Sequence, residues 1–373
     1  MMRRPHQVEG NLGRRGCLLP MLAALMLAAS MLVRWSLRKC ADAPFSCPVI
    51  GGASPTLFVM ADTLTVALAQ IAPVWLDRDQ TIDKVVEWAT RAAEAGAGLV
   101  AFGEALVPGY PWWVGQTDGA RFDDERQKQW FAHYVEQSCD PQTHFEELAE
   151  LASENEMAIV LGCMERAIDR SGHSVYCSLI TIGQDGVIKP AHRKLMPTYE
   201  ERLVWAQGDG HGLRTHSVPP FRLGALNCWE NWMPLPRAAL HAQGEDLHVA
   251  IWPGSKHNTD EVTRFIAREG RSYALSASSL MRREDIPDDV PYADELRAAL
   301  PEVSGNGGSC IAGPDGSWVI EPVVGREELL VATLDHAFVR RERHNLDVSG
   351  HYSRPEILHV EVDPTRHQEL RSK

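Results

Sequence analysis

The stretch TLTVALAQI at residues 63–71, followed by DQTIDKVVEWATRAAEAG at 79–96 and GLVAFGE at 98–104, predicts the fold class. The first and third segments are apolar, whereas the middle one repeats apolar residues at helical spacing and ends at Gly96. Strand, helix and strand within about forty residues are typical of a parallel βαβ unit, whose functional ends are the carboxyl ends of its strands. Glu104 lies at such an end, and the sequence predicts an α/β protein.

The alternation of strands and helices continues through most of the chain. An Asp-Gly pair at 185–186, between two apolar runs, is typical of a hairpin turn. Further strands are expected at 157–163, 221–228, 246–253, 272–279, 307–323 and 328–335. Further helices are expected at 145–156, 234–244 and near 260–270. Because no repeat or low-complexity linker interrupts them, we expect one domain over 62–335 and an extended tail over 336–373.

The overall composition is that of a globular protein. The 373 residues are 44% hydrophobic and 23% charged, which excludes collagen-like, disordered and multi-span membrane classes. The net charge of −13 repels phosphate groups, so we expect no nucleic-acid partner.

Residues 1–59 differ from the rest of the chain. Seven cations and two anions give this segment a charge of +5 and leave −18 for the remainder, and residues 18–33 form an apolar run. Three interpretations stay open: a start placed too far upstream of Met60, a secretory signal or membrane anchor at 14–35, and a genuine basic extension. We expect a cytoplasmic protein, exported or anchored to a membrane only if this segment is part of it.

The cysteines are too few for a disulfide scaffold. Three of the eight lie in residues 1–59 and five in the body, where an odd number leaves at least one thiol free. The sequence contains no C-x-x-C pair and no histidine cluster at zinc-ligand spacing. We therefore expect a reduced chain without a metal site.

Three reactive side chains follow apolar strands. After Cys228 the chain turns sharply into a helix whose first turn holds Pro234 and Pro236. A thiol on such an elbow lies near main-chain N–H groups that stabilise an anion, although a buried structural cysteine has the same pattern. Glu104 and Lys194 also end apolar strands, where an unpaired charge is costly to bury. Singly, each is compatible with an ordinary surface charge.

Together, the motifs around these residues resemble the nitrilase superfamily. Glu104 lies in FGEALVPGYPWW, Lys194 in HRKLMPTYEERLVWAQGDG and Cys228 in LGALNCWENWMPL, in the family's order and at comparable spacing. Three further motifs match: AREGRSYALSAS at 267–278, GGSCIAGPDG at 307–316 and SGHYSRPEI at 349–357. The Cys-Trp-Glu-Asn tetrad at 228–231 and the Gly-His-Tyr-x-Arg-Pro run at 350–355 resemble the true nitrilase branch.

The resemblance covers about residues 62–360 and implies a fold and a set of catalytic roles. The implied fold is an α-β-β-α sandwich of two packed sheets with helices outside. The implied roles are Cys228 as nucleophile, Glu104 as general base and Lys194 as anion stabiliser, aided by the main-chain N–H of Trp229. No metal or organic cofactor is expected, because thiol, carboxylate and ammonium cover this chemistry.

A second glutamate and several aromatic residues complete the implied site. Glu201 matches the family's supporting glutamate, with Glu200 as the alternative. The candidates for contact with substrate are Tyr110, Trp113, Trp229 and Trp252, with Trp112 beside them. Any of these aromatics is equally compatible with a place in the core. Gly115 and Ala206 depart from the family's pattern, and the small residue at 115 favours aryl or arylalkyl nitriles.

The resemblance implies hydrolysis of a small-molecule nitrile to a carboxylic acid and ammonia. The alternatives within the superfamily are an aliphatic amidase or carbamoylase and a cyanide hydratase or dihydratase. A binding or scaffold protein without catalysis is the alternative of another class. The family also implies a homo-oligomer, a dimer extending to a spiral, with the loop 281–306 and the tail after 336 as contact elements. His351 in that tail is expected to be structural or at an interface.

Overall fold

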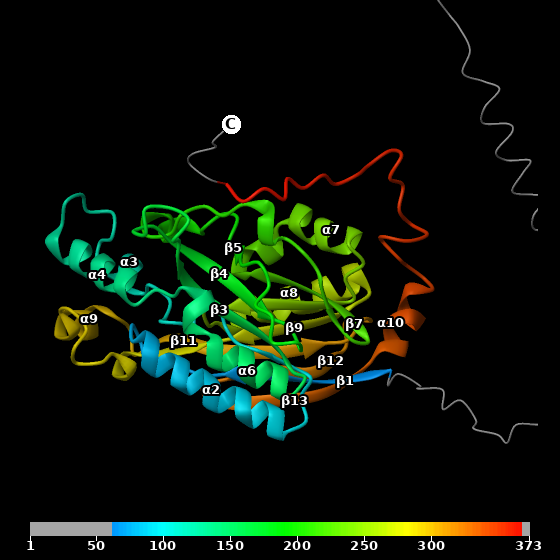
Figure 1. Cartoon of the computed structure of the whole chain (residues 1–373), viewed down its shortest axis with the longest axis horizontal. Coiled ribbons are helices and arrows are strands. Elements are labelled where there is room, and N and C mark those ends of the chain that lie inside the picture. Colours follow the sequence, from blue (N-terminus) through cyan, green and yellow to red (C-terminus); the bar gives the residue numbers. More distant parts are fainter. Residues whose placement is uncertain (1–61, 368–373) are drawn as a thin grey trace, which may run out of the picture. The chain divides into compact units, whose positions relative to one another are not determined.

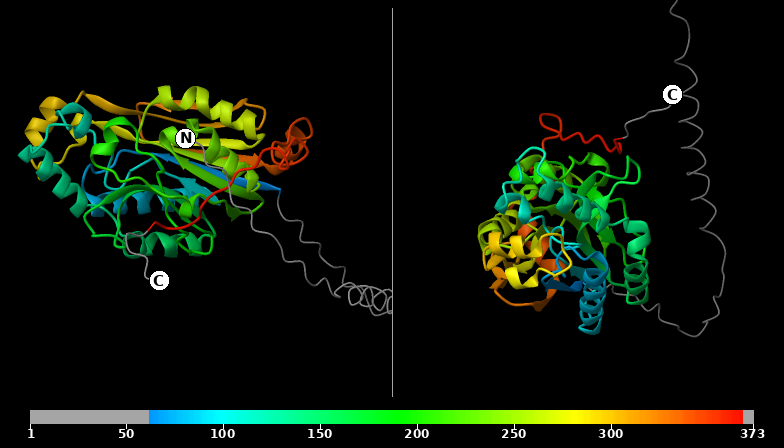
Figure 2. Two further views of the ribbon diagram at one scale, coloured as in Figure 1. Left: turned by 90° about the horizontal axis from the view of Figure 1, so that it is seen from above. Right: turned by 90° about the vertical axis from the view of Figure 1, so that its left-hand side faces the viewer.

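The structure, a computed structural model, describes residues 62–367, so the expected leader at 1–59 lies outside the described residues. Within them, two β-sheets pack face to face between layers of helices (Figure 1). The left view of Figure 2 shows the strands between helices above and below. The α-β-β-α sandwich expected from the resemblance is confirmed.

Six of the described strands form the first sheet, in the order β13-β1-β2-β3-β4-β5. Their bounds are β1 (Thr63–Gln70), β2 (Leu99–Ala101), β3 (Ala158–Arg166), β4 (Val175–Ile182), β5 (His192–Arg193) and β13 (Glu328–Asp335). The central strands β1, β2 and β3 are parallel, whereas β13, β4 and β5 pair antiparallel. The predicted βαβ unit is therefore present, with α2 (Arg78–Glu94) connecting β1 to β2.

The second sheet holds seven of the described strands, in the order β10-β11-β9-β8-β7-β6, with β12 paired to β11. Their bounds are β6 (His216–Val218), β7 (Phe221–Asn227), β8 (Leu247–Trp252), β9 (Tyr273–Ser278), β10 (Leu280–Arg282), β11 (Val303–Ala312) and β12 (Trp318–Val324). Here β7, β8 and β9 are parallel. Each sheet thus has a parallel centre, and the carboxyl ends of β2 and β7 carry the two segments that hold Glu104 and Cys228.

Alternation of side chains along the strands explains why the sheets stack as they do. In β1, Val66 and Leu68 face the core between the sheets, whereas Ala67 and Ala69 face the helices α2 and α6 (Glu146–Glu154). In β8, Val249 enters the same intersheet core. The opposite face of the second sheet packs against α8 (Lys256–Gly270), with α7 (Pro234–Ala242) beside it. Both faces of each sheet are therefore covered by apolar side chains.

Several elements differ from the sequence-based expectation. The helix α4 (Glu125–Glu136) was not predicted, and α9 (Ala293–Ala299) lies within the expected loop 281–306. The tail expected to be extended from 336 begins with the helix α10 (His336–Arg343), because Asp335 accepts the Ala337 N–H at 2.8 Å and caps it. Two short helices, α3 (Trp113–Gln116) and α5 (Pro141–His144), were also not predicted.

The domain boundaries at 62–335 and 336–373 stay a prediction, although the pairing of β1 with β13 brings Thr63 opposite Asp335. None of the helices among the described residues combines the length and the hydrophobicity that a membrane span requires.

Candidate active site

Glu104 lies just beyond the carboxyl end of β2, in the layer between the two sheets. Its main-chain N–H donates to the Trp252 carbonyl at 3.1 Å, so the segment after β2 is tied to the end of β8 in the other sheet. The residue is 1% exposed. An acid at this place is therefore held in an environment where its charge needs a partner.

Lys194 supplies that partner. It follows β5, where its main-chain N–H donates to the Cys177 carbonyl at 2.8 Å. Its Nζ lies 2.9 Å from Glu104 Oε1 and 2.7 Å from Glu201 Oε2. The same ammonium lies 5.2 Å from the centre of the Trp205 ring. One buried cation is thus shared by two buried carboxylates.

Cys228 is the first residue after β7 and begins the 3₁₀ helix η3 (Cys228–Trp232). Its φ of 42° lies in the left-handed region of backbone conformation, which residues other than glycine seldom adopt. Strain of this kind persists only where surrounding contacts hold it, and it is common at functional sites. The predicted turn into a helix is confirmed, since α7 begins at Pro234 directly after η3.

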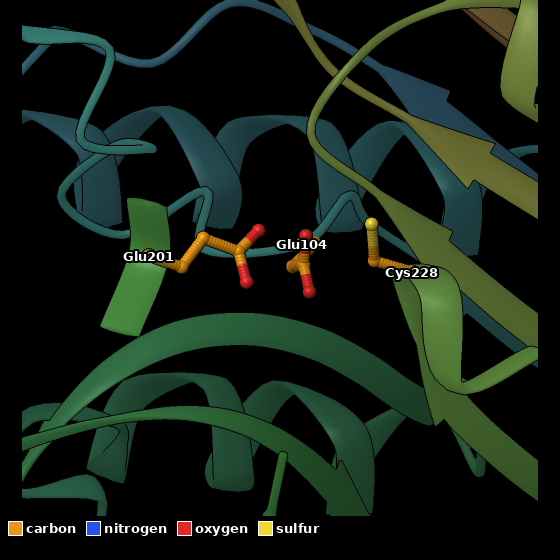
Figure 3. Close-up of side chains that lie close together, drawn as sticks. All are labelled: Glu104, Glu201 and Cys228. Atoms are coloured by element: carbon orange, nitrogen blue, oxygen red, sulfur yellow. The ribbon is translucent and has the colours of Figure 1, made fainter. Parts of the chain in front are cut away.

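The sequence-predicted trio and Glu201 come together in space. One carboxylate oxygen of Glu104, one of Glu201 and the Sγ atom of Cys228 all lie within 4.8 Å of one another. Figure 3 shows the Glu104 carboxylate between the Glu201 carboxylate and the Cys228 thiol. Because Lys194 contacts both carboxylates, acid, cation and thiol form one contiguous buried group.

The distances among these three side chains would also suit a metal ion. The Lys194 ammonium, however, lies within 3 Å of both carboxylates and already occupies the place of a cation between them. A second positive charge there would face strong repulsion. The donor set therefore suits the ammonium rather than a metal.

Burial and the balance of charge set the protonation of the acid. Burial raises the pKa of Glu104 to about 7; the Lys194 ammonium opposes this rise and the Glu201 carboxylate adds to it. Burial alone would lower the pKa of Lys194, but the charges of Glu104 and Glu201 raise it well above its ordinary value. A buried carboxylate that titrates near neutral pH is suited to accept and return a proton.

The thiol is neutral at rest. Burial, together with the nearby Glu104 charge, raises the pKa of Cys228 well above its ordinary value, while Lys194 and the Trp229 main-chain N–H act in the opposite direction. A preformed thiolate is therefore disfavoured, and attack by this sulfur requires a base beside it. Glu104 is placed to be that base.

Glu201 is held by three donors. It lies in the 3₁₀ helix η1 (Tyr199–Leu203) and accepts from the Tyr110 hydroxyl at 2.8 Å and the Thr198 main-chain N–H at 2.5 Å, besides Lys194. The Tyr110 and Thr198 contacts fix the position of the carboxylate, which in turn binds the Lys194 ammonium. The neighbouring Glu200 instead has its carboxylate next to Gly115, where a Cβ would approach it to 2.9 Å.

The predicted aromatic residues occupy different environments. Tyr110 contacts the site through its hydroxyl group, and Trp229 is exposed beside the nucleophile. Trp113 is fully buried and packs edge-on against Trp75 and Tyr134.

Trp252 is likewise fully buried, in the apolar cluster that contains Cys228, and its indole N–H donates to Ser276 at 3.1 Å. Contact of Tyr110, Trp113, Trp229 or Trp252 with a substrate stays a prediction.

Three other residues singled out in the sequence lie outside the catalytic group. Gly115 faces Glu200, Ala206 follows the Trp205 ring that contacts Lys194, and His351 is exposed in the tail, where its ring contacts Tyr352.

Sequence reasoning missed residues that support the nucleophile and the base. The Cys177 thiol lies 3.6 Å from Glu104 Oε1. Asn231 donates to the Cys228 carbonyl at 2.8 Å and contacts His248 Nε2 at 2.7 Å through its own oxygen. The other ring nitrogen of His248 lies 2.7 Å from a Glu245 oxygen. Only Asn231 carried a sequence signal, as the last residue of the tetrad at 228–231.

Comparison with known proteins supplies independent information. A family model described as carbon-nitrogen hydrolase matches residues 65–343. A protein named nitrilase 2, from an unknown prokaryotic organism, is 37% identical over 303 residues, which cover 80% of this chain and 92% of that protein. An aliphatic nitrilase from Sinorhizobium fredii (strain HH103) is 36% identical over 302 residues, covering 80% and 94% respectively.

The fold has solved counterparts. An amidase from Nesterenkonia sp. AN1 superimposes with a TM-score of 0.55 at 19% sequence identity, covering 76% of this chain and 98% of the amidase. At that identity the likeness concerns the fold alone.

Proposed function

The chain belongs to the carbon-nitrogen hydrolase family, and from that premise we propose that it is a nitrilase, which converts an organic nitrile to a carboxylic acid and ammonia. The observation that carries the proposal is the contiguous buried group of Cys228, Glu104, Glu201 and Lys194, in which an oxygen of each carboxylate and the sulfur lie within 4.8 Å of one another. The named nitrilases at 36–37% identity support the nitrile as the substrate class.

Glu104 takes the proton of the Cys228 thiol as the sulfur attacks the nitrile carbon. The Lys194 ammonium, with the main-chain N–H of Trp229, stabilises the negative charge that develops on nitrogen. Glu104 then returns the thiol proton to that nitrogen, which gives a thioimidate and restores the carboxylate. Because the thiol is neutral at rest, proton transfer to Glu104 and attack by sulfur belong to the same step.

Two water molecules complete the turnover. Glu104 accepts a proton from the first water as the water oxygen adds to the thioimidate carbon. It passes this proton to the nitrogen of the tetrahedral adduct, whose carbon–nitrogen bond then breaks as the hydroxyl loses its proton to become the carbonyl, which releases ammonia and leaves a thioester. The second water cleaves the carbon–sulfur bond, releases the acid and returns the proton to the thiol. Glu201 acts as a supporting residue, since it holds Lys194 and touches Tyr110.

A panel of substrates tests the proposal. Ammonia release is measured with phenylacetonitrile, a dinitrile, cyanide and a simple amide. Turnover of an organic nitrile supports a nitrilase, whereas turnover of the amide without any nitrile assigns the chain to the amidase or carbamoylase branch. Turnover of cyanide alone assigns it to the cyanide-converting enzymes. The small residue at 115 favours an aryl or arylalkyl substrate, whereas the relative from Sinorhizobium fredii is named an aliphatic nitrilase.

The pH dependence of the reaction follows from Glu104. Its carboxylate must be ionised to act as a base, and its pKa is raised to about 7. We therefore expect kcat/KM to fall about tenfold per pH unit below about pH 7. Glu201→Gln removes a negative charge that raises this pKa, so the fall should begin at lower pH in this variant.

Glu200→Gln is the matched control for that shift, because its carboxylate lies beside Gly115. It should leave the midpoint of the pH profile in place. A midpoint that moves with Glu200→Gln and not with Glu201→Gln would transfer the supporting role to Glu200.

We further propose that the protein is a cytoplasmic homo-oligomer with one catalytic domain over 62–335. The five cysteines within the described residues are free, which suits a reducing compartment. Large apolar side chains are exposed around α7 and α8, which suits burial against a second copy; they are Trp232, Met233, Leu235 and Phe265. Size-exclusion chromatography with light scattering should give a mass above that of a monomer, and a monomer at micromolar concentration would contradict the proposal.

A further inference from the structure

Glu230 is a buried acid two residues after the nucleophile that the mechanism does not use. It is 1% exposed and accepts three hydrogen bonds. Its Oε2 accepts from the Asn227 main-chain N–H at 2.9 Å and contacts His192 Nε2 at 3.0 Å, and its Oε1 accepts from the Leu195 main-chain N–H at 2.6 Å. Both oxygens of a single carboxylate are therefore engaged.

The three partners come from the two segments that carry the reactive groups. Asn227 ends β7 in the second sheet and directly precedes Cys228. His192 lies in β5 of the first sheet, and Leu195 directly follows Lys194. The Glu230 carboxylate thus links His192 and Leu195, on either side of Lys194, to Asn227, the residue before Cys228. These two segments belong to different sheets, which share no main-chain strand pairing among the described residues.

We propose that Glu230 is a positioning residue that fixes the Lys194 ammonium relative to the Cys228 sulfur, an inference that rests on the proposed function of the same site. Neither segment is bound to the other by strand pairing, because β5 and β7 belong to different sheets. The separation of cation and thiol therefore depends on side chains that span the gap, and Glu230 spans it with three bonds.

The hydrogen-bond arrangement requires an ionised carboxylate. The two main-chain groups can only donate, and His192 Nδ1 is buried without a partner among the described residues, so its hydrogen belongs on Nε2. Although burial acts to raise the pKa of Glu230, the His192 ring and the two main-chain N–H groups lower it below the ordinary value. A neutral amide could not satisfy the same three donors.

Asn231 provides a contrast within the same tetrad. Its amide nitrogen donates to the Cys228 and Leu226 carbonyls, at 2.8 and 3.2 Å, and its oxygen contacts His248 in β8. All of these partners belong to the second sheet or to the elbow itself. Asn231 holds the shape of the elbow, whereas Glu230 holds the elbow relative to the lysine.

The variant Glu230→Gln tests the proposal, because it keeps the shape of the side chain but turns one acceptor into a donor. Whichever way the amide is oriented, an N–H group then faces a donor from one of the two segments. We expect kcat to fall about 100-fold, the effect of a misplacement of about 1 Å, with KM changed less than about threefold.

A second readout needs no substrate. The rate at which iodoacetamide alkylates Cys228, followed by mass spectrometry, should fall about tenfold in Glu230→Gln, because a displaced lysine stabilises the thiolate less. The alkylation rate tests the role of Glu230 separately from the nitrilase proposal, because it needs no substrate. The kcat measurement does so too when it uses whichever nitrile or amide the unmodified enzyme hydrolyses. An unmodified enzyme that turns over no nitrile contradicts the nitrilase proposal and leaves Glu230 to be judged on the amide and on alkylation.

Glu165→Gln is the matched control. Glu165 is a buried carboxylate that accepts from Ser178 at 2.6 Å and from Arg193, next to Lys194, but it has no bond to the elbow. The Glu165→Gln substitution should lower the melting temperature, while kcat stays within about threefold of the value for the unmodified enzyme. Losses of kcat and of stability that are alike in Glu230→Gln and Glu165→Gln would overturn the proposal, because the role of Glu230 would then be structural only. A folded Glu230→Gln enzyme with full kcat would overturn it as well.

Where Glu230→Gln fails to fold, His192→Phe decides the question. It removes one of the three bonds and keeps the ring, and we expect kcat to fall about tenfold. Unchanged kcat and an unchanged alkylation rate in this variant would overturn the proposal.

Discussion

Cys228→Ala should abolish ammonia release from every substrate that the unmodified enzyme hydrolyses. We expect a loss of about 10⁴-fold or more, because the thioimidate and the thioester both require a covalent bond to this sulfur. Glu104 and Lys194 stay in place and can still bind a nitrile, but neither can form the intermediate. Ammonia is measured at substrate concentrations far above KM, so that a change in binding does not imitate a loss of chemistry.

Cys310→Ala is the control for the loss of a buried thiol. Cys310 in β11 is fully buried and contacts Thr263 at 3.5 Å, in the layer between the second sheet and α8. Its removal should cost about 1 kcal/mol of stability, as the removal of the Cys228 sulfur should, and leave ammonia release unchanged. Ammonia release that persists in Cys228→Ala would refute the nucleophile and, with it, the covalent mechanism.

The sequence predicted the sheets better than the surface helices. The apolar run of β1 and the helical spacing of apolar residues in α2 are local signals, so the positions of these two elements were predicted to within one or two residues. The helix α4 offers a weaker pattern, because only Trp130 and Tyr134 are fully buried on it and its first five residues are all polar. The indole N–H of Trp130 donates to the Pro291 carbonyl at 2.6 Å, a contact far along the chain that no local pattern reveals.

The same division applies to the active site. Glu104, Lys194, Glu201 and Cys228 were found because each lies in a motif, and the structure brings all four together. The function of Glu230 depends on its bonds across two sheets, which the tetrad at 228–231 does not encode by itself. Its identity was visible in the sequence, but its partners follow only from the way β5 and β7 meet.

Lys194→Met should lose both activity and stability, since it leaves the carboxylates of Glu104 and Glu201 facing each other without the cation between them. We expect kcat to fall about 10³-fold, because the anion on nitrogen loses its main stabilising charge. We also expect the free energy of unfolding at pH 8 to fall by about 3–5 kcal/mol, the usual cost of removing one member of a buried ion pair. Urea denaturation followed by tryptophan fluorescence measures this change.

The sign of the pH dependence identifies the cause of that instability. Without the ammonium, the pKa of Glu104, which burial already raises, rises further above that of the unfolded chain. The folded variant then gains a proton on acidification, so its loss of stability should shrink as the pH falls towards the unfolded pKa of glutamate and grow as the pH rises through the folded pKa of Glu104. Lys84→Met breaks a partly exposed pair with Glu327 and should change stability by less than about 1 kcal/mol with activity intact. A Lys194→Met deficit that did not depend on pH would indicate lost packing of the lysine stem, and would contradict a cation that balances two buried acids.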